Sequence, residues 1–218
     1  YAASWGSKHY LVKDNKPQRV DGQLGSFSYR ADSKDLAYQM STPGKGWVAP
    51  GTGWVVSNGK PGEVFQMVGP PHYAPKGSLL AHVSITPRKS GNATNQANKA
   101  MVVGGKKGEF VEEITEWAFS PDGKLLAYAA RIQKDRWVVL NSQRGKSYDA
   151  VSGILFSPDS RSLTYRAGRD ATSFMVLDGK QGPGFDRVSE AVFSPDSKHL
   201  AYTAKAGGKQ FVVVDGAE

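Results

Sequence analysis

Apolar residues in this chain occur in short runs separated by turn-forming residues. No long stretch has apolar residues that recur with the helical period of 3.6 residues. In the segment 152–188 the runs are Gly153–Phe156, Leu163–Arg166, Ser173–Leu177 and Phe185–Val188. Short apolar runs bounded by Gly, Pro, Asp and Ser are typical of β-strands. We therefore predict an all-β protein with almost no helix, and we name the four strands of this segment A, B, C and D in chain order.

The end of strand A and the turn after it recur along the chain as a ten-residue motif. The clearest copies are Phe119–Tyr128, Phe156–Tyr165 and Phe193–Tyr202, and weaker copies begin at Tyr29 and Tyr73. Their first aromatic residues lie roughly 40 residues apart, a period typical of the four-stranded blades of β-propellers. We expect Phe119, Phe156 and Phe193, and Trp117 beside the first of them, to lie in the core between blades.

Two kinds of turn are predicted inside each repeat. In the motif, Pro195 presets φ for the first corner and Asp196 can bond nearby backbone amides, so we assign Asp122, Asp159 and Asp196 to turns rather than to chemistry. After strand C, residues that accept positive φ predict tight hairpins. These pairs are Asp14-Asn15, Asn58-Gly59, Gly104-Gly105, Asp178-Gly179 and Asp215-Gly216.

The motif Phe119-Ser120-Pro121-Asp122-Gly123-Lys124-Leu125-Leu126-Ala127-Tyr128 resembles the TolB-type propeller repeat, and the resemblance covers essentially the whole chain. It implies a β-propeller of four-stranded antiparallel blades. Such blades occur in the periplasmic TolB protein, in the non-catalytic domains of prolyl-oligopeptidase-like enzymes, in oligouronide lyases and in secreted proteins. The resemblance therefore implies a bacterial protein outside the cytoplasm, periplasmic or secreted, and leaves the activity open.

The uniform repeat predicts one domain over residues 1–218. The repeat units span approximately 1–24, 25–68, 69–114, 115–151, 152–188 and 189–218, of which the first and last are partial. Residues 1–14 align with residues 202–215, so the chain starts at a B strand and stops after a C strand. We expect a six-bladed ring with one blade incomplete; the alternatives are a fragment of a seven- or eight-bladed ring, or edge strands that pair between molecules.

Positive charge gathers at one end of the predicted blades. The net charge is +8, and Lys and Arg crowd the B–C loops, where we count only Asp135 and Asp170 against them. Two of these loops, 41–54 and 86–99, are longer than the others, and loops on a rigid scaffold often carry function. The predicted binding residues of this B–C loop face are Lys45, Trp47, Arg88, Lys89, Arg131, Lys134, Arg136, Arg166, Arg169 and Lys205. Such a face concentrates anionic partners, and an exposed Trp47 would be an interface anchor.

Candidate catalytic chemistry is sparse. The chain has no Gly-x-Ser-x-Gly elbow and no cysteine, and its four histidines lack metal-ligand spacing. We therefore predict no catalytic residue, no metal and no cofactor. No apolar run is long enough to span a membrane, and no pattern of a specific nucleic-acid module appears.

Three functions fit this sequence. The leading hypothesis is a non-enzymatic binding or scaffold propeller that engages a protein or an anionic glycan through the B–C loop face. The first alternative is a lyase or hydrolase acting on an anionic carbohydrate in the central channel. The second is a structural subunit of a homo-oligomer or larger assembly that forms through the terminal strands.

Overall fold

The computed structural model describes residues 2–5, 8–44, 51–87 and 97–217, and every regular element among them is a β-strand. The chain divides into two compact units. Unit 1 comprises residues 1–74 and 78–110, and unit 2 comprises residues 75–77 and 111–218. Lys45, Trp47, Arg88 and Lys89, four of the predicted binding residues, lie outside the described residues. The single domain over residues 1–218 stays a prediction.

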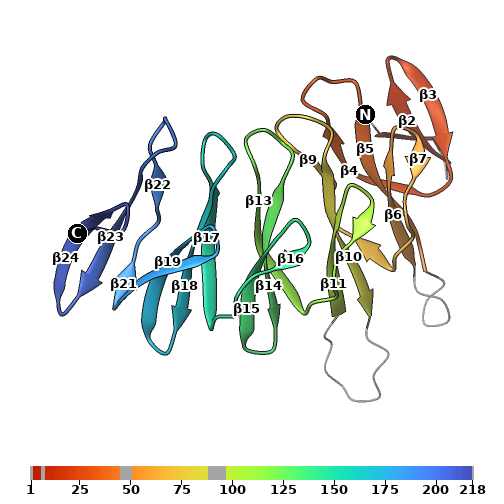
Figure 1. Cartoon of the computed structure of the whole chain (residues 1–218). Helices are drawn as coiled ribbons and strands as arrows, with labels where there is room; N and C mark the ends of the chain where they lie inside the picture. Colours follow the sequence, from red (N-terminus) through yellow and green to blue (C-terminus); the bar gives the residue numbers. More distant parts are fainter. Residues whose placement is uncertain (1, 6–7, 45–50, 88–96, 218) are drawn as a thin grey trace. The chain divides into compact units, whose positions relative to one another are not determined.

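Unit 1 contains three antiparallel sheets (Figure 1). The first consists of β1 (Ala2–Trp5), β2 (Lys8–Lys13) and β3 (Lys16–Val20). The second consists of β4 (Gln23–Tyr29), β5 (Leu36–Thr42), β6 (Thr52–Ser57) and β7 (Lys60–Pro61). In the third, β8 (Met67–Val68) and β9 (His72–Tyr73) both pair with β10 (Leu80–Pro87), followed by β11 (Ala97–Val103) and β12 (Lys106–Lys107).

Unit 2 contains three more antiparallel sheets. The first consists of β13 (Glu113–Phe119), β14 (Leu126–Ile132), β15 (Asp135–Leu140) and β16 (Gln143–Arg144). The second consists of β17 (Ala150–Phe156), β18 (Leu163–Arg169), β19 (Thr172–Leu177) and β20 (Lys180–Phe185). In the third, which we call the last sheet, β21 (Arg187–Val188) and β22 (Val192–Phe193) pair with β23 (Leu200–Ala206), which pairs with β24 (Lys209–Val214).

The sheets have the A–B–C–D order that the repeat predicts. Strands β17, β18 and β19 confirm A, B and C of the segment 152–188. The predicted outer strand at Phe185–Val188 is wrong, because strand D is β20 and β21 pairs with β23 of the next sheet. Phe185 ends the outer strand instead of beginning it. The all-β fold with four-stranded antiparallel propeller blades is confirmed, while the number of blades stays a prediction.

Each inner strand is interrupted at the same place. β4, β13 and β17 carry irregularities between Leu24 and Phe27, between Ile114 and Glu116, and between Ser152 and Leu155. In the last sheet the inner strand is split into β21 and β22, both of which pair with β23. Bulges re-aim side chains and free backbone groups from the ladder, and in β17 the freed amides of Gly153 and Ile154 donate to Glu116 of the neighbouring sheet.

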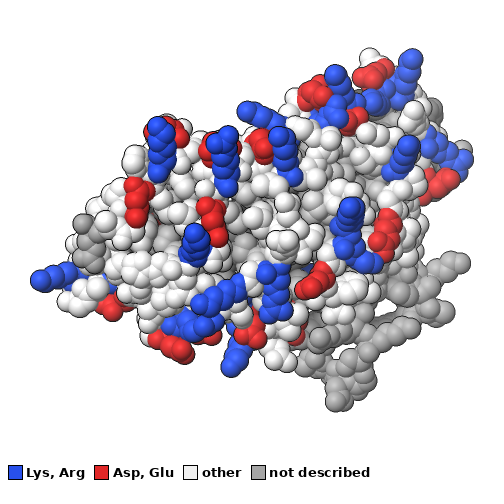
Figure 2. Space-filling model, in the orientation of Figure 1, with Lys and Arg blue, Asp and Glu red and all other residues white. Residues whose placement is uncertain are grey.

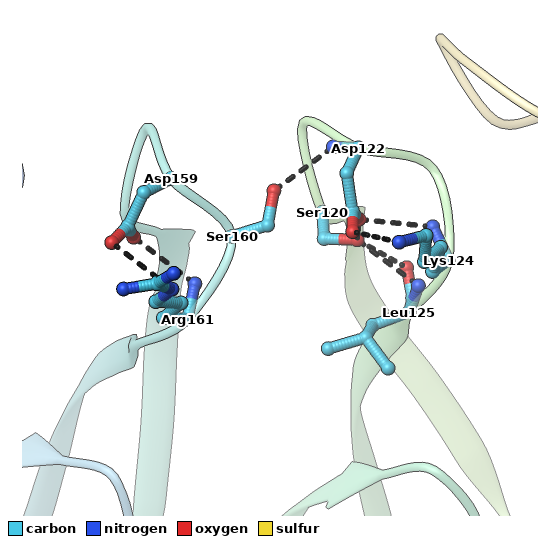
Figure 3. A network of polar contacts seen from close by, with 7 residues as sticks. All are labelled: Ser120, Asp122, Lys124, Leu125, Asp159, Ser160 and Arg161. Atoms are coloured by element: carbon cyan, nitrogen blue, oxygen red, sulfur yellow. Dashed lines mark hydrogen bonds and ion pairs between the residues drawn. The ribbon is translucent and has the colours of Figure 1, made fainter.

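The predicted turns are confirmed in detail. Asp178 and Gly179 have φ of 50° and 78°, and the other four predicted pairs also have positive φ at both positions. In the motif turn, the Asp122 carboxylate accepts hydrogen bonds from the Ser120 hydroxyl at 2.6 Å and from the Lys124 amide at 3.1 Å (Figure 3). These bonds hold the pKa of Asp122 below its usual value. The turn aspartates therefore have a structural role.

Neighbouring motif turns in unit 2 are joined by hydroxyl groups. The amide of Asp122 donates to Ser160 Oγ at 2.9 Å (Figure 3). In the same way, the amide of Asp159 donates to Ser197 Oγ at 3.0 Å. Each bond links one repeat to the next about one blade period further on. The repeat therefore fixes the register between sheets as well as the turns within them.

The core of unit 2 lies between its sheets. One cluster joins Ala127 and Val138 of the first sheet to Phe156 and Tyr165 of the second. The prediction that Trp117 belongs to the core is wrong, because this side chain is 39% exposed. Trp117 lies on β13, which is an edge strand of its sheet, so that strand has a neighbouring strand on one side only. In unit 1, Trp54 of β6 packs against a buried cluster.

Candidate functional site

The described binding residues predicted from the sequence fall into two groups. Arg131, Lys134 and Arg136 surround the turn between β14 and β15, while Arg166, Arg169 and Lys205 lie on the B strands β18 and β23. The cations are not concentrated as the sequence count suggested. Figure 2 shows acidic side chains among the basic ones at the end of the unit 2 sheets where their B–C turns lie.

Arg131 is neutralised within its own sheet. Its Nε donates to Glu113 at 2.8 Å and its Nη1 to Glu112 at 3.3 Å. Glu113 lies directly opposite Arg131 in the register of β13 and β14. The sequence count had left out both carboxylates, because it considered the loops and not the start of the inner strand. Arg131 therefore contributes little free charge to this end of the sheet.

Two other predicted cations hold the backbone. Arg136 Nη1 donates to the Asp149 carbonyl, and Arg169 Nη2 donates to the Ser147 carbonyl. The Arg169 guanidinium also lies over the ring of Tyr148, with its central carbon 5.5 Å from the ring centroid. These contacts orient the segment between strands D and A, which is a structural use of both side chains.

Arg166 of β18 and Lys205 of β23 line a pocket of about 650 Å³ beside the last sheet. Its other lining residues are Arg187, Ser189, Glu190, Thr203, Ala204 and Gln210. The charged lining thus contains three cations and one carboxylate. The inner strand is interrupted between Val188 and Val192, where the Ser189 amide still donates to the Thr203 carbonyl at 2.9 Å and the Ser189 hydroxyl accepts from the Thr203 amide at 2.9 Å. We call this site the cationic pocket.

The lining of the cationic pocket contains a pair of like charges on neighbouring strands. Arg187 lies directly opposite Lys205 in the register of β21 and β23. The same two positions hold Glu113 and Arg131 in the first sheet of unit 2, and Ala150 and Gly168 in the second. Like charges directly opposite on a sheet destabilise it. An anion bound between Arg187 and Lys205 would relieve this repulsion.

Arg166 contributes to the pocket lining from the neighbouring sheet. Its Nε is buried and has no hydrogen-bond partner among the described residues, while its Nη2 lies 3.9 Å from Glu190 Oε1. A Cβ at Gly153, where φ is +69°, would lie 3.3 Å from Nε, so glycine leaves room for the guanidinium. A buried donor without a partner costs free energy. Arg166 belongs to the pocket lining and its side chain is 29% exposed, so an anion can approach the exposed part of the guanidinium there.

A second pocket lies in unit 1 and has a different chemistry. Its volume is about 340 Å³, and its lining has no charged side chain. Gln39 of this pocket follows the motif tyrosine Tyr38, just as Arg166 follows Tyr165. Gln39 is satisfied by a 2.7 Å bond to the Val68 carbonyl. Because the corresponding pocket is neutral, the three cations of the cationic pocket are a property of the last sheets and not of the repeat itself.

Sequence reasoning identified Arg166 and Lys205 but missed Arg187 and Glu190. Arg187 was placed in an outer strand, and only its pairing with β23 brings it opposite Lys205. Among the described residues, no group of three or more His, Asp or Glu side chains is arranged to hold a metal ion. No helix of the described chain is long and apolar enough to cross a membrane.

Comparison with known proteins agrees with this architecture. No family model and no curated protein matches the sequence. Similar solved structures include TolB from Acinetobacter baumannii, which is 12% identical with a TM-score of 0.39 and 95% of this chain covered. They also include the β-propeller domain of the Trilobed protease from Pyrococcus furiosus, 14% identical with a TM-score of 0.48 over 90% of this chain and 69% of that one.

An acylaminoacyl peptidase from Pyrococcus horikoshii is also similar, 12% identical with a TM-score of 0.41 over 96% of this chain. The present chain spans 56% of the TolB chain and 40% of the peptidase chain. At these identities the likeness concerns the fold alone. It agrees with the resemblance of the motif to TolB-type propeller repeats, and it leaves the ligand to be argued from the site.

Proposed function

We propose that this protein is a non-enzymatic binding propeller that holds an anionic group of a protein or glycan ligand in the cationic pocket. The observation that carries the proposal is the direct opposition of Arg187 and Lys205 beside the unpartnered Nε of Arg166. Charge-assisted hydrogen bonds from guanidinium to carboxylate are about twice as strong as neutral ones. A carboxylate between these three cations would gain such bonds and screen the repulsion.

The alternative of a lyase or hydrolase has less support. Glycoside hydrolysis by the usual route uses two carboxyl groups, whereas Glu190 is the single carboxylate among the residues that line the pocket. The location proposed with this function is periplasmic or secreted in a bacterium, because the motif resembles TolB-type repeats.

The test is calorimetric titration with a short poly-glutamate peptide and, separately, with an oligogalacturonate. The double variant Arg187→Ser with Lys205→Ser should weaken binding at least tenfold. The matched control, Arg161→Ser with Lys198→Ser, removes the same charge from exposed motif turns, where these side chains are 87% and 76% exposed. It should weaken binding less than twofold. If neither ligand binds, or if both double variants weaken binding equally, the proposal is wrong.

A further inference from the structure

The first and second sheets of unit 2 are joined through one repeat position, and we call this contact the first junction. The third residue before the motif aromatic is Glu116 in the first sheet and Gly153 in the second. The Glu116 carboxylate accepts hydrogen bonds from the Gly153 and Ile154 amides, both at 2.9 Å. Both amides lie at the irregularity of β17. A carboxylate of one sheet therefore satisfies two amides of the next.

The second junction, where the second and last sheets pack together, has the corresponding amides without such a carboxylate. One repeat further on, the amides belong to Glu190 and Ala191, in the interruption between β21 and β22. Neither amide has a hydrogen-bond partner among the described residues. The residue at the position of Glu116 in the second sheet is Gly153, which has no side chain. The described chain thus supplies no carboxylate to these two amides.

The charge beside this repeat position is also different at the second junction. The residue after the motif tyrosine is Ala129 in the first sheet and Arg166 in the second. Ala129 is buried and lies opposite Glu116 in register. The Arg166 guanidinium lies beside Gly153, because a Cβ there would be 3.3 Å from its Nε. A carboxylate and a small residue at the first junction are therefore replaced by a glycine and a cation at the second.

Arg166 does not close the second junction by itself. In unit 1, Gln39 has the position of Arg166, and its Nε2 donates to the Val68 carbonyl of the next sheet at 2.7 Å. Arg166 approaches Glu190 instead, with 3.9 Å between Nη2 and Oε1 and with the glutamate side chain 83% exposed. The second junction therefore presents donors from both sheets, and among the described residues neither the guanidinium nor the two amides have a hydrogen-bond acceptor.

We propose that a glutamate side chain of an acidic peptide ligand supplies the acceptor at the second junction, in the position that Glu116 holds at the first. Its carboxylate accepts hydrogen bonds from the Glu190 and Ala191 amides and faces the Arg166 guanidinium. The inference rests on the proposed function, because the ligand reaches this junction through the cationic pocket, which Arg166 and Glu190 line. An acidic peptide fits because the chain's own occupant of this position is a carboxylate on a flexible arm, whereas the carboxylate of a uronate is fixed to a sugar ring.

The NMR signals of the Glu190 and Ala191 amides test this inference during titration with the short poly-glutamate peptide. Both protons should move downfield in a saturable way, because each gains a charged acceptor. The Gly153 and Ile154 amides are the internal control. Glu116 already bonds them, so their signals should not move downfield. At equal saturation, an oligogalacturonate should move the Glu190 and Ala191 signals less than poly-glutamate does.

A pair of variants tests the role of the cation at the junction. Arg166→Gln removes the charge and keeps a side chain that, as Gln39 shows, can reach the next sheet. It should weaken poly-glutamate binding about tenfold, as expected for one hydrogen bond to a charged group, and should reduce the shift of both amides at equal peptide concentration. The matched control Arg161→Gln removes the same charge from a motif turn, where this side chain is 87% exposed, and should change neither quantity.

The possible results separate this inference from the proposed function. Poly-glutamate binding that is lost with Arg187→Ser and Lys205→Ser, while the Glu190 and Ala191 signals stay in place throughout the titration, would overturn the inference and leave the proposed function intact. If oligogalacturonate moves both signals downfield at lower concentration than poly-glutamate, the ligand is a glycan and the inference is again wrong. If neither ligand binds in calorimetry, the proposed function fails and the inference fails with it.

Discussion

Replacing Glu116 by alanine tests how the interrupted inner strands join neighbouring sheets in unit 2. The Glu116 carboxylate accepts a hydrogen bond from the Gly153 amide and another from the Ile154 amide, both at 2.9 Å. Both amides lie at the irregularity of β17. Glu190 occupies the same repeat position, three residues before the motif aromatic, but its side chain is 83% exposed. The two glutamates therefore form a matched pair.

The expected magnitudes follow from these contacts. A hydrogen bond to a charged group contributes about 1.5–3 kcal/mol, and an amide left without a partner adds a desolvation penalty. Because the two bonds share one carboxylate and the Gly153 amide is only partly buried, Glu116→Ala should lower the free energy of unfolding by about 2–4 kcal/mol. Glu190→Ala removes a weak exposed contact and should change it by less than about 0.5 kcal/mol.

Urea unfolding followed by tryptophan fluorescence measures both variants, and an unchanged slope with urea would show that the same surface unfolds in each. The reasoning is refuted if Glu116→Ala stays within about 0.5 kcal/mol of the wild type, or if the two variants lose the same amount. Either result would mean that the carboxylate of Glu116 does not join the two sheets.

Three further predictions concern titration and charge. Burial lowers the pKa of His82 to about 4, so the free energy of unfolding should fall by roughly 3 kcal/mol as the pH drops from 6.5 towards 4. In acid unfolding curves, His82→Tyr should abolish that loss. An acid unfolding curve of His82→Tyr identical to that of the wild type would contradict this. The hydrogen bond to Asp215 raises the pKa of His199, so the NMR titration midpoint of His199 should lie above 6.5 and should fall with Asp215→Asn. The ion pair between His199 and Asp215 stabilises the protein below pH 6.5, and this stabilisation is lost as the pH rises through the midpoint. A midpoint that Asp215→Asn leaves unchanged would contradict the ion pair. Glu190→Gln removes the one carboxylate of the cationic pocket and should tighten poly-glutamate binding a few-fold in calorimetry, whereas weaker binding would show that Glu190 helps to hold the ligand.

Local features of this fold could be predicted from the sequence. The turn aspartates and the hairpins after strand C depend on residues within a few positions of one another, such as Asp178 and Gly179. The same holds for the A, B and C strands, whose apolar runs are bounded by those turns. The recurrence of the motif then gave the blade architecture without any knowledge of which sheets touch.

Features that depend on pairing between sheets could not be predicted. No turn signal separates Phe185 from Arg187, so the sequence does not show that the first pairs with β19 and the second with β23. That one ambiguity hid the opposition of Arg187 and Lys205. In the same way, the neutralisation of Arg131 depends on the register that places Glu113 opposite it. Charges counted along loops miss partners that arrive from neighbouring strands.

The central claim is that an anion reaches Arg166 inside the cationic pocket, and the NMR signal of the Arg166 Nε–H group tests it most directly. This donor is buried and has no described partner. Assigned by comparison with Arg166→Lys, its proton signal should move downfield in a saturable way as poly-glutamate is added, in step with the calorimetric binding curve. If binding saturates while this signal stays in place, the anion binds elsewhere and the account of the site is wrong.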